Sequence, residues 1–545
     1  MATRRKNIRT QLAAAKQQLE LQRVRTERRE LKLKDRALRM REKLSVYASA
    51  EKNRHTEDWK ARTLTADEAI IPDGPTLVAR ARQSRRDNWM TASATFAFKR
   101  SIVGTGINPR SNARAPITGD LKKGDAFDVF NKTVNWWWRL WSSKPRWCDV
   151  ECRRTFAMME SYIAEEWPIA GQAFAILCYR PRLDMCGLAL QFFEVEQLDH
   201  TMRTSPDTGF EIRDGIEIEP KTSAPVAYWV FTEGIDGQIR SKSERLPAER
   251  VIHIYDPQRV RQTHGVTRFA PVLTTIRHTS MYEEYQILAA RYEAIFGGVI
   301  ESDAATGINP GLPPGLDETG LDANGNEELI LEPGLFPRTK PGEKVNWFDP
   351  KRPGTSYEPF VKTQTRHVGA GIDLDGALLE RNFTDGSYTA QRQGQNEADK
   401  ATDPAQAMMF DLFVQRVREE FKLLLLLEKR VKAPGYFSDT MLRDAYLTDE
   451  WAGPPKKWID EAKQAAAAKI QVEQRFRPLS DIHLEQGYFT QEVAQQTAED
   501  EAVFEDAGVA LPREISTAAP PVDKREPRPG YESDNEPVVD EPAVK

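Results

Sequence analysis

Residues 271–298 of this chain read PVLTTIRHTSMYEEYQILAARYEAIFGG. The proline at the start of this stretch and the glycine pair at its end are the residues that typically begin and follow a helix. Between them, apolar side chains recur at intervals of four, three, four and three residues, at Met281, Tyr285, Leu288, Tyr292 and Ile295. This spacing predicts a helical rod of about 25 residues and ~38 Å that packs lengthwise against a partner.

The region before this rod is predicted to be mixed α/β. A helix is expected over 76–86, and a tryptophan-rich helix is expected to end near Ser142. Short β-rich runs with hairpin-length connections then predict antiparallel sheet at 174–179, 188–195, 215–218, 226–231 and 251–255. His253 alternates with Ile252 and Ile254, so we expect its side chain to face away from the core and not to form a site by itself.

The region after the rod is rich in turns and then becomes helical. Strands are expected at 299–301, 328–331 and 344–348, followed by a second, shorter helix over 363–371 and a polar, glycine-rich loop from 373 to 394. Asp403 and Pro404 are expected to cap and open a long helix that ends before Pro434. Further helices are predicted at 458–476 and 491–506, and the proline-rich residues after 520 are expected to be disordered.

Composition and charge exclude several classes of protein. The chain has 545 residues, a net charge of -5 and four cysteines, and its longest purely aliphatic run is Leu423 to Leu427. That run is too short for a membrane span, which needs ~18 residues. Residues 1–44 carry 15 Lys/Arg and 5 Asp/Glu, a local +10, so the remaining chain carries -15. An acidic body of this kind disfavours a tight, sequence-reading DNA-binding protein.

The sequence offers few groups for catalysis or metal binding. The cysteines, at 148, 152, 178 and 186, have spacings that favour buried thiols over a zinc site. No nucleophile elbow, P-loop or HExxH signature is present. Asp373 and Asp375 with Glu380 could hold a magnesium ion, and a metal-dependent nuclease centred on this region is therefore one alternative function. A cytosolic adaptor that forms no ring is another.

Four segments, in this order along the chain, resemble the lambda family of phage portal proteins. They are residues 102–106 (IVGTG), 148–159 (CDVECRRTFAMM), 246–256 (LPAERVIHIYD) together with 262–265 (QTHG), and 382–392 (NFTDGSYTAQR). In the last segment, Ser387, Tyr388 and Arg392 keep the family's spacing, whereas Gln391 stands where the family motif has alanine. The resemblance extends over roughly residues 80–505.

The resemblance implies an α+β portal fold and a ring of identical subunits, usually twelve, around a channel for double-stranded DNA at one capsid vertex. It divides the chain into nine parts: a basic, partly helical arm (1–60), a mixed α/β wing (61–270), a stem helix (271–298), a β clip (299–360), a second stem helix (361–372), a tunnel-loop region (373–402), a long helix returning to the wing (403–455), a helical crown (456–510) and a disordered tail (511–545).

The resemblance also implies functional residues and partners. The channel residues would be Arg381, Asn382, Thr384, Asp385, Ser387, Tyr388, Arg392 and Lys400, and the stem-packing residues Met281, Tyr285, Leu288, Tyr292 and Ile295. The expected partners are further copies of the chain, the terminase large subunit, the major capsid and scaffold proteins, head-completion and tail connector proteins, and DNA bound without sequence preference. We expect no enzymatic activity, metal, cofactor or membrane, and we expect assembly in the host cytoplasm before incorporation into the virion.

Overall fold

The computed structural model describes residues 28, 29, 32, 34, 61–114, 124–233, 239–295, 299–302, 343–346, 357–382, 388–456 and 460–508. The chain divides into two compact units, residues 1–69 and 70–545. A short helix, α2 (Ala66–Ile70), spans the boundary. All but four residues of the predicted arm, and all of the predicted tail, lie outside the described residues.

Helices form the described residues from 74 to 170 of the large unit, apart from short connections and strand β1 (Asn108–Ser111), and contribute to its main core. They are α3 (Gly74–Asp87), α4 (Trp89–Ile102), α5 (Gly124–Ser142), α6 (Pro145–Cys148) and α7 (Phe156–Ala170). Asn88 separates α3 from α4 and caps α4, because its Oδ1 accepts the Met90 N–H at 2.8 Å. Trp138 and Trp141 of α5 are buried, with ring centroids 5.0 Å apart, so these two tryptophans belong to the core, whereas Trp136 is exposed.

Two antiparallel sheets follow, as predicted. The first has the order β3 (Leu188–Phe193), β2 (Gln172–Tyr179), β8 (Val251–Tyr255). The second has the order β4 (Glu211–Arg213), β5 (Ile216–Ile218), β6 (Pro225–Glu233), β7 (Ile239–Pro247). The 3-10 turns η3 (Val195–Gln197) and η4 (Ala248–Arg250) flank these strands. Strand β7 was not predicted, because its sequence IRSKSERLP is mostly polar.

The expectation that the His253 side chain faces away from the core was wrong. Its ring stacks between Phe174 and Tyr255, with centroids 4.4 Å from each, and its Nε2 lies 3.0 Å from Gln172 Oε1. The two faces of strand β8 pack against two different apolar clusters. Ile252 belongs to one cluster and Val251 to the other, so neither face is turned wholly to solvent. Burial therefore lowers the pKa of His253 well below its ordinary value.

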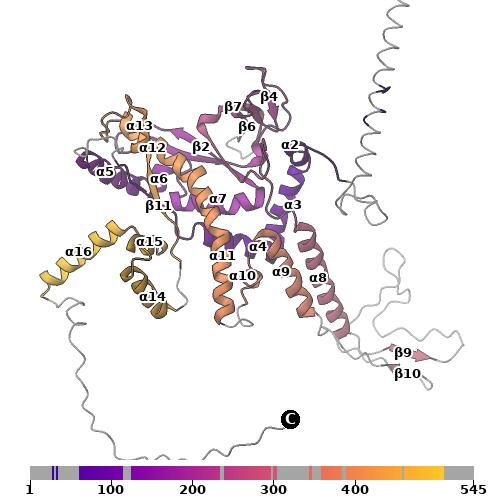
Figure 1. Cartoon of the computed structure of the whole chain (residues 1–545). Coiled ribbons are helices and arrows are strands. Elements are labelled where there is room, and N and C mark those ends of the chain that lie inside the picture. The colour runs from indigo at the N-terminus through magenta and orange to yellow at the C-terminus, as the bar shows by residue number, and fades with distance from the viewer. Residues whose placement is uncertain are drawn as a thin grey trace, which may run out of the picture. The chain divides into compact units, whose positions relative to one another are not determined.

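The predicted rod is helix α8 (Leu273–Ile295), which lies beside α9 (Tyr357–Ile372) (Figure 1). Tyr282 of α8 contacts the rings of Tyr357 and Phe360 of α9, with centroids 6.1 Å and 4.8 Å apart. Helix α9 begins six residues before the predicted start at 363. Strands β9 (Val299–Ser302) and β10 (Glu343–Asn346) pair antiparallel, and the strand predicted at 328–331 lies outside the described residues.

The region after α9 is far more helical than predicted. It contains α10 (Gly376–Glu380), α11 (Tyr388–Met409), the π-helical turn η5 (Phe410–Val414) and α12 (Gln415–Leu427). The prediction that Asp403 caps a new helix was wrong, because α11 has already begun at Tyr388 and carries Pro404 inside it. The polar run before Pro404 is rich in good helix formers such as Ala, Gln and Glu, which explains why it is helical.

The remaining elements are α13 (Thr440–Leu447), β11 (Asp449–Ala452), α14 (Glu461–Glu473), α15 (Leu479–Glu485) and α16 (Thr490–Asp506). The two C-terminal helices predicted at 458–476 and 491–506 are thereby confirmed, with α14 shorter than expected. Strand β11 pairs antiparallel with β1 (Asn108–Ser111), an unpredicted contact between distant parts of the sequence. In the described part of the chain, no helix is both long and apolar enough to cross a membrane.

Candidate functional site

The predicted channel residues lie at the junction of α10 and α11. Arg381 follows α10 directly, is exposed, and has a left-handed backbone (φ 53°) that turns the chain away from the helix. Tyr388 begins α11, and Arg392 and Lys400 lie farther along it. Thr384, Asp385 and Ser387 are outside the described residues. Helices α10 and α11 thus occupy most of the predicted 30-residue loop region, and residues 381–387 lie between them in the sequence.

Helix α10 is fixed on both sides. Asp375 caps it by accepting the Ala377 N–H at 2.9 Å, and Leu379 is buried with its carbonyl oxygen accepting from Ser93 Oγ of α4 at 2.7 Å. Helix α11 passes close to the same cap, because a Cβ at Gly394 would lie 2.7 Å from Asp375 Oδ2. Helices α10 and α11, which flank residues 381–387, therefore fix both ends of this segment.

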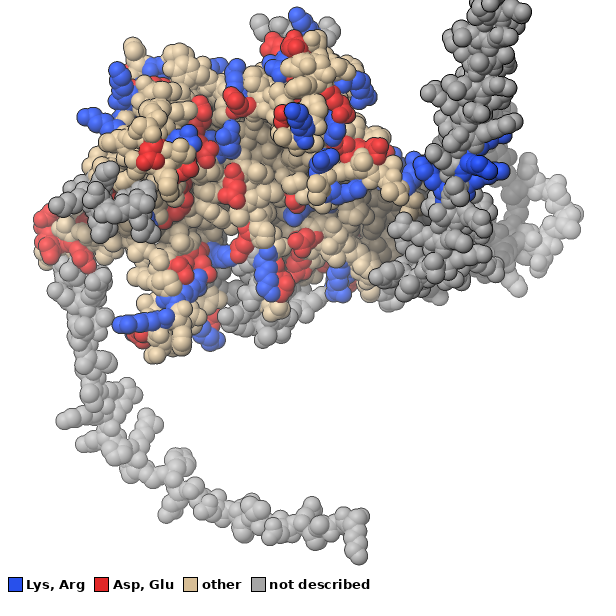
Figure 2. Space-filling view, turned by 45° about the horizontal axis from the view of Figure 1, so that its top comes forward, with Lys and Arg blue, Asp and Glu red and all other residues tan. Residues whose placement is uncertain are grey.

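The charges near this junction are mixed in sign. Lys400 is well exposed and pairs with Glu397 at 2.8 Å one turn away. Asp403, the predicted cap, instead pairs with Lys456 at 2.9 Å. Figure 2 shows blue and red side chains interspersed over the face that it presents. Local pairing of this kind weakens any attraction of a polyanion to the individual lysines.

One carboxylate of the alternative nuclease site has a structural role. Asp375 is the helix cap described above, and Asp373 lies at a positive φ of 61° just after α9. Within the described residues, no group of three or more His, Cys, Asp or Glu side chains could hold a metal ion. Asp373 also lies near Arg268, whose guanidinium stacks over the rings of Phe98 and Trp167.

The predicted stem-packing residues are only partly covered by their own chain. Met281 and Leu288 are half-buried, whereas Tyr285 is 60% exposed. The side chains of Tyr292 and Ile295 are outside the described set. The contact to α9 is made by Tyr282, which the heptad spacing did not single out. Its neighbours Tyr357 and Phe360 lie beyond the intervening β module, so no local pattern could have indicated the pair.

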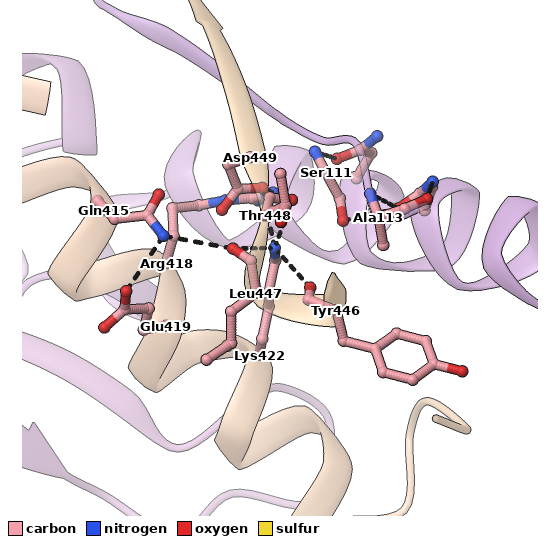
Figure 3. Close-up of polar contacts among 12 residues, drawn as sticks. Ser111, Ala113, Gln415, Arg418, Glu419, Lys422, Tyr446, Leu447, Thr448 and Asp449 are labelled. Carbon is pink, nitrogen blue, oxygen red and sulfur yellow. Dashed lines mark hydrogen bonds and ion pairs between the residues drawn. The ribbon is translucent and has the colours of Figure 1, made fainter. Parts of the chain in front are cut away.

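A buried ionic cluster holds the far end of the long helical run (Figure 3). Asp449 Oδ1 lies 2.7 Å from Arg418 Nη2 and 3.0 Å from Lys422 Nζ, and all three side chains are fully buried. Lys422 Nζ also donates to the carbonyl oxygens of Tyr446, Leu447 and Thr448 at 3.0, 3.1 and 3.3 Å. The ammonium group thus satisfies carbonyls at the C-terminus of α13, where a cation is favoured.

The charges of the cluster do not balance, since one buried carboxylate faces two cations. Burial lowers the pKa of Lys422 to about 8, although Asp449 opposes the shift. Arg418 gains a further contact, because its guanidinium lies 4.7 Å from the centre of the Trp138 ring. Helices α11 and α12 therefore form one run from Tyr388 to Leu427 whose first end adjoins the candidate loop and whose second end is anchored to α13, β11 and α5.

The QTHG segment fixes the base of helix α8. The Gly265 N–H donates to Gln172 Oε1 at 3.0 Å, and Gln262 Nε2 donates to the His264 carbonyl at 2.7 Å. The backbone here is so close to strand β2 that a Cβ at Gly265 would lie 1.9 Å from the Gly171 carbonyl oxygen. This segment thus connects β2 to the chain that leads into α8, a packing role that sequence spacing did not indicate.

Comparisons with known proteins support the order of motifs seen in the sequence. Residues 52–406 match the model of the family described as "Phage portal protein, lambda family". The chain is 25% identical over 500 residues to the "Probable portal protein" of Halomonas phage phiHAP-1, covering 90% of this chain and 92% of that one. It is 22% identical over 453 residues to "Portal protein B" of Escherichia phage lambda, covering 76% and 81%.

A solved structure, the neck of an empty gene transfer agent particle, shows a more distant likeness. It has a TM-score of 0.40 and 10% identity, and the match covers 76% of this chain and 93% of that one. At this distance the likeness does not define the fold of the chain.

Proposed function

The chain belongs to the lambda family of phage portal proteins, and from this premise we propose that it forms the ring-shaped channel at one capsid vertex. Double-stranded DNA passes through this channel when it is packaged and again when it is ejected. The observation that carries the proposal is the family match over residues 52–406, together with a relative matched over nearly its whole length.

The finer features of the proposal concern stoichiometry and partners. The ring contains twelve copies, assembles in the host cytoplasm with scaffold and major capsid proteins, and receives DNA from the terminase large subunit. Head-completion and tail connector proteins later attach to the clip. The adjacent helices α8 and α9 with the β9–β10 hairpin serve as stem and clip, and residues 381–387 serve as the tunnel loop.

The portal family is structural, and we propose that this chain is not an enzyme and that the terminase supplies ATP hydrolysis. The nuclease alternative makes a different prediction, namely magnesium-dependent DNA cleavage that Asp373→Ala abolishes. The use of Asp375 as a helix cap disfavours that alternative, because the cap and a metal ion would compete for the same carboxylate.

The first test of the proposal is the mass of the purified full chain, followed by imaging of the main peak. Rings of about a dozen subunits with a central hole are expected, because closed cyclic assemblies are the usual outcome of repeated identical contacts. A monomer or dimer that persists at high concentration and in the presence of scaffold would contradict the portal proposal and favour a non-ring adaptor.

The second test addresses the tunnel loop. Deletion of residues 384–393, which removes the loop and the first residues of α11, is expected to spare ring assembly but to impair DNA packaging or retention. A sharper variant replaces only residues 383–387 with Gly and Ser, so that α11 keeps its full length. Normal packaging and genome retention in both variants would remove the tunnel-loop assignment.

A further inference from the structure

We propose that α14 and α16 form an interface between neighbouring copies of this chain, with α16 of one copy packed against α14 of the next. The inference rests on the proposed ring and adds the two surfaces that meet in its C-terminal part. On α16 the surface comprises Glu499, Asp500 and Val503, and on α14 it comprises Lys463, Lys469 and Ile470.

The first observation is that neither helix buries any residue. Helix α14 has 13 residues and α16 has 17, and most of their residues are exposed, whereas others such as Val472 and Thr497 are half-buried. Figure 1 shows them on either side of the short helix α15. Isolated helices of ~12–15 residues are marginal in water, and helices in proteins gain most of their stability from packing. Each of these two helices therefore has a face that the described part of its own chain leaves uncovered.

The second observation is where the exposed apolar groups lie. Helix α16 is attached near its first turn, where Arg139 Nη2 pairs with Glu492 Oε1 at 3.1 Å. Its distal half carries Val503, which is 66% exposed, next to Glu499 and Asp500 one turn earlier on the same face. On α14, Ile470 is 57% exposed, and four consecutive alanines before Lys469 would allow another helix to approach closely.

The third observation is charge complementarity. Helix α16 carries six acidic residues and no lysine or arginine, and the red cluster at the left edge of Figure 2 marks it. Like charges one turn apart destabilise an isolated helix, so α16 favours a cationic neighbour. On α14, Lys463 and Lys469 are 81% and 76% exposed. Their pairs with Asp460 and Glu473 lie at the surface, where such pairs contribute little.

A second copy fits both surfaces better than another occupant does. One chain presents an acidic and apolar surface on α16 and a lysine-bearing, apolar surface on α14, and both are open in the same copy. Two different surfaces that complement each other make a head-to-tail contact, and head-to-tail contacts generate rings when the rotation closes.

The experiment uses full-length chains and begins with the mass of the assembly. One chain carries Ile470→Cys and the other Val503→Cys, and both carry Cys152→Ser to remove the exposed native thiol. The two chains are purified with different tags, co-assembled and oxidised mildly. We expect a disulfide that joins the two different chains in a large fraction of the rings. The matched control pairs Ile470→Cys with Met441→Cys, which is 64% exposed on α13, and should give little product.

A charge-swap series tests the ionic part of the interface. Glu499→Lys with Asp500→Lys should reduce the cross-linked product several-fold, and adding Lys463→Glu with Lys469→Glu should restore it. Sodium chloride at about 1 M should weaken the effect of the swap, because it screens exposed charges. Two outcomes would overturn this interface and leave the portal proposal standing. The rings could show no cross-link, or the pair with Met441→Cys could give as much cross-linked product as the pair with Val503→Cys. Absence of rings would overturn both.

Discussion

Asp449 faces two cations in a place where its side chain is fully buried. In Asp449→Asn, Arg418 and Lys422 would remain buried without their counter-charge. Removing one partner of a buried ionic group typically costs ~3–5 kcal/mol, and we expect the free energy of unfolding to fall by that amount. Urea unfolding followed by circular dichroism measures it.

The matched control is Asp444→Asn, whose side chain is 68% exposed and close to the same helix end. It should change the stability by less than about 0.5 kcal/mol. Equal stability of Asp449→Asn and the unmodified chain would show that the cluster does not anchor the helical run.

Glu160 gives the stability a defined dependence on pH. Burial raises the pKa of Glu160 from 4.5 to about 8, although its Oε2 accepts the Ile107 N–H at 3.0 Å. Between these two pH values the folded chain keeps a proton that the unfolded chain has released. The contribution of Glu160 to the free energy of unfolding is therefore fully present below pH 4.5, and it is lost as the pH rises toward about 8.

Glu160→Gln should remove this loss, since the amide has no proton to release. We expect the variant to be more stable than the unmodified chain near pH 8 by roughly 2–5 kcal/mol, with a much smaller difference near pH 4.5. Thermal unfolding at the two pH values measures the difference. Glu165→Gln, on the same helix but partly exposed, is the control for the loss of a carboxylate from this helix. If the stability of Glu160→Gln changed with pH in the same way as that of the unmodified chain, the raised pKa of Glu160 would be contradicted.

Single residues of this kind were the least predictable from sequence. Arg418 and Asp449 are 31 residues apart, and charged residues in a leucine-rich helix look like its solvated face. His253 looked like a surface side chain because strand alternation cannot tell a second core from solvent. In each case the deciding fact is a neighbour supplied by tertiary packing.

At the scale of elements, the contact between β2 and the QTHG segment depends on two glycines. Gly171 has a φ of 81°, and a Cβ at Gly265 would meet the Gly171 carbonyl oxygen at 1.9 Å. Because the obstacle is backbone, it cannot move aside as a side chain could. Gly265→Ala should lower the free energy of unfolding by at least about 3 kcal/mol.

The measurement is again urea unfolding of the full chain, together with ring assembly by mass. Gly74→Ala is the matched control, because a Cβ there meets nothing within 4 Å and the residue begins α3. Its stability should be equal to or slightly above that of the unmodified chain. A Gly265→Ala variant as stable as this control would rule out the close approach.

Elements with clear start and stop residues in the sequence were predicted well, and elements that depend on distant partners were not. Helix α8 has proline before it, glycine after it and a regular stripe, and it was found almost to the residue. Strands β1 and β11 are four residues each and exist through pairing across more than 300 residues of sequence. Helix α11 was missed because Pro404 was taken as a start, whereas the helix has already begun at Tyr388 and carries Pro404 inside it.

At the scale of the whole molecule, the family was predictable because several weak motifs occur in one order. The family match over 52–406 confirms that prediction, and none of the motifs would have sufficed alone. The candidate site was only partly predictable. The sequence predicts a tunnel-loop region over 373–402, but it could not show that α11 begins at Tyr388 or that Lys400 pairs with Glu397.

The charge of the whole chain leads to a prediction about DNA. Each copy carries a net -5, so we expect the proposed ring to repel the phosphate backbone except where exposed cations such as Arg381 come near it. Each phosphate that a cation neutralises adds about 0.9 to the slope of log affinity against log salt. We therefore expect purified rings to bind double-stranded DNA weakly, with a shallow slope and no preference among sequences, as fluorescence anisotropy would measure.

Glu397→Lys tests this reasoning on helix α11, which follows the loop. The change removes the partner of Lys400 and adds a cation, so affinity and the salt slope should both rise, and DNA packaging should slow because the duplex is held. Glu211→Lys on β4, with a side chain 61% exposed, makes the same change of charge on the sheet and should alter neither quantity appreciably if DNA passes only by the loop. Tight, steeply salt-dependent binding by unmodified rings would contradict a channel through which DNA must slide.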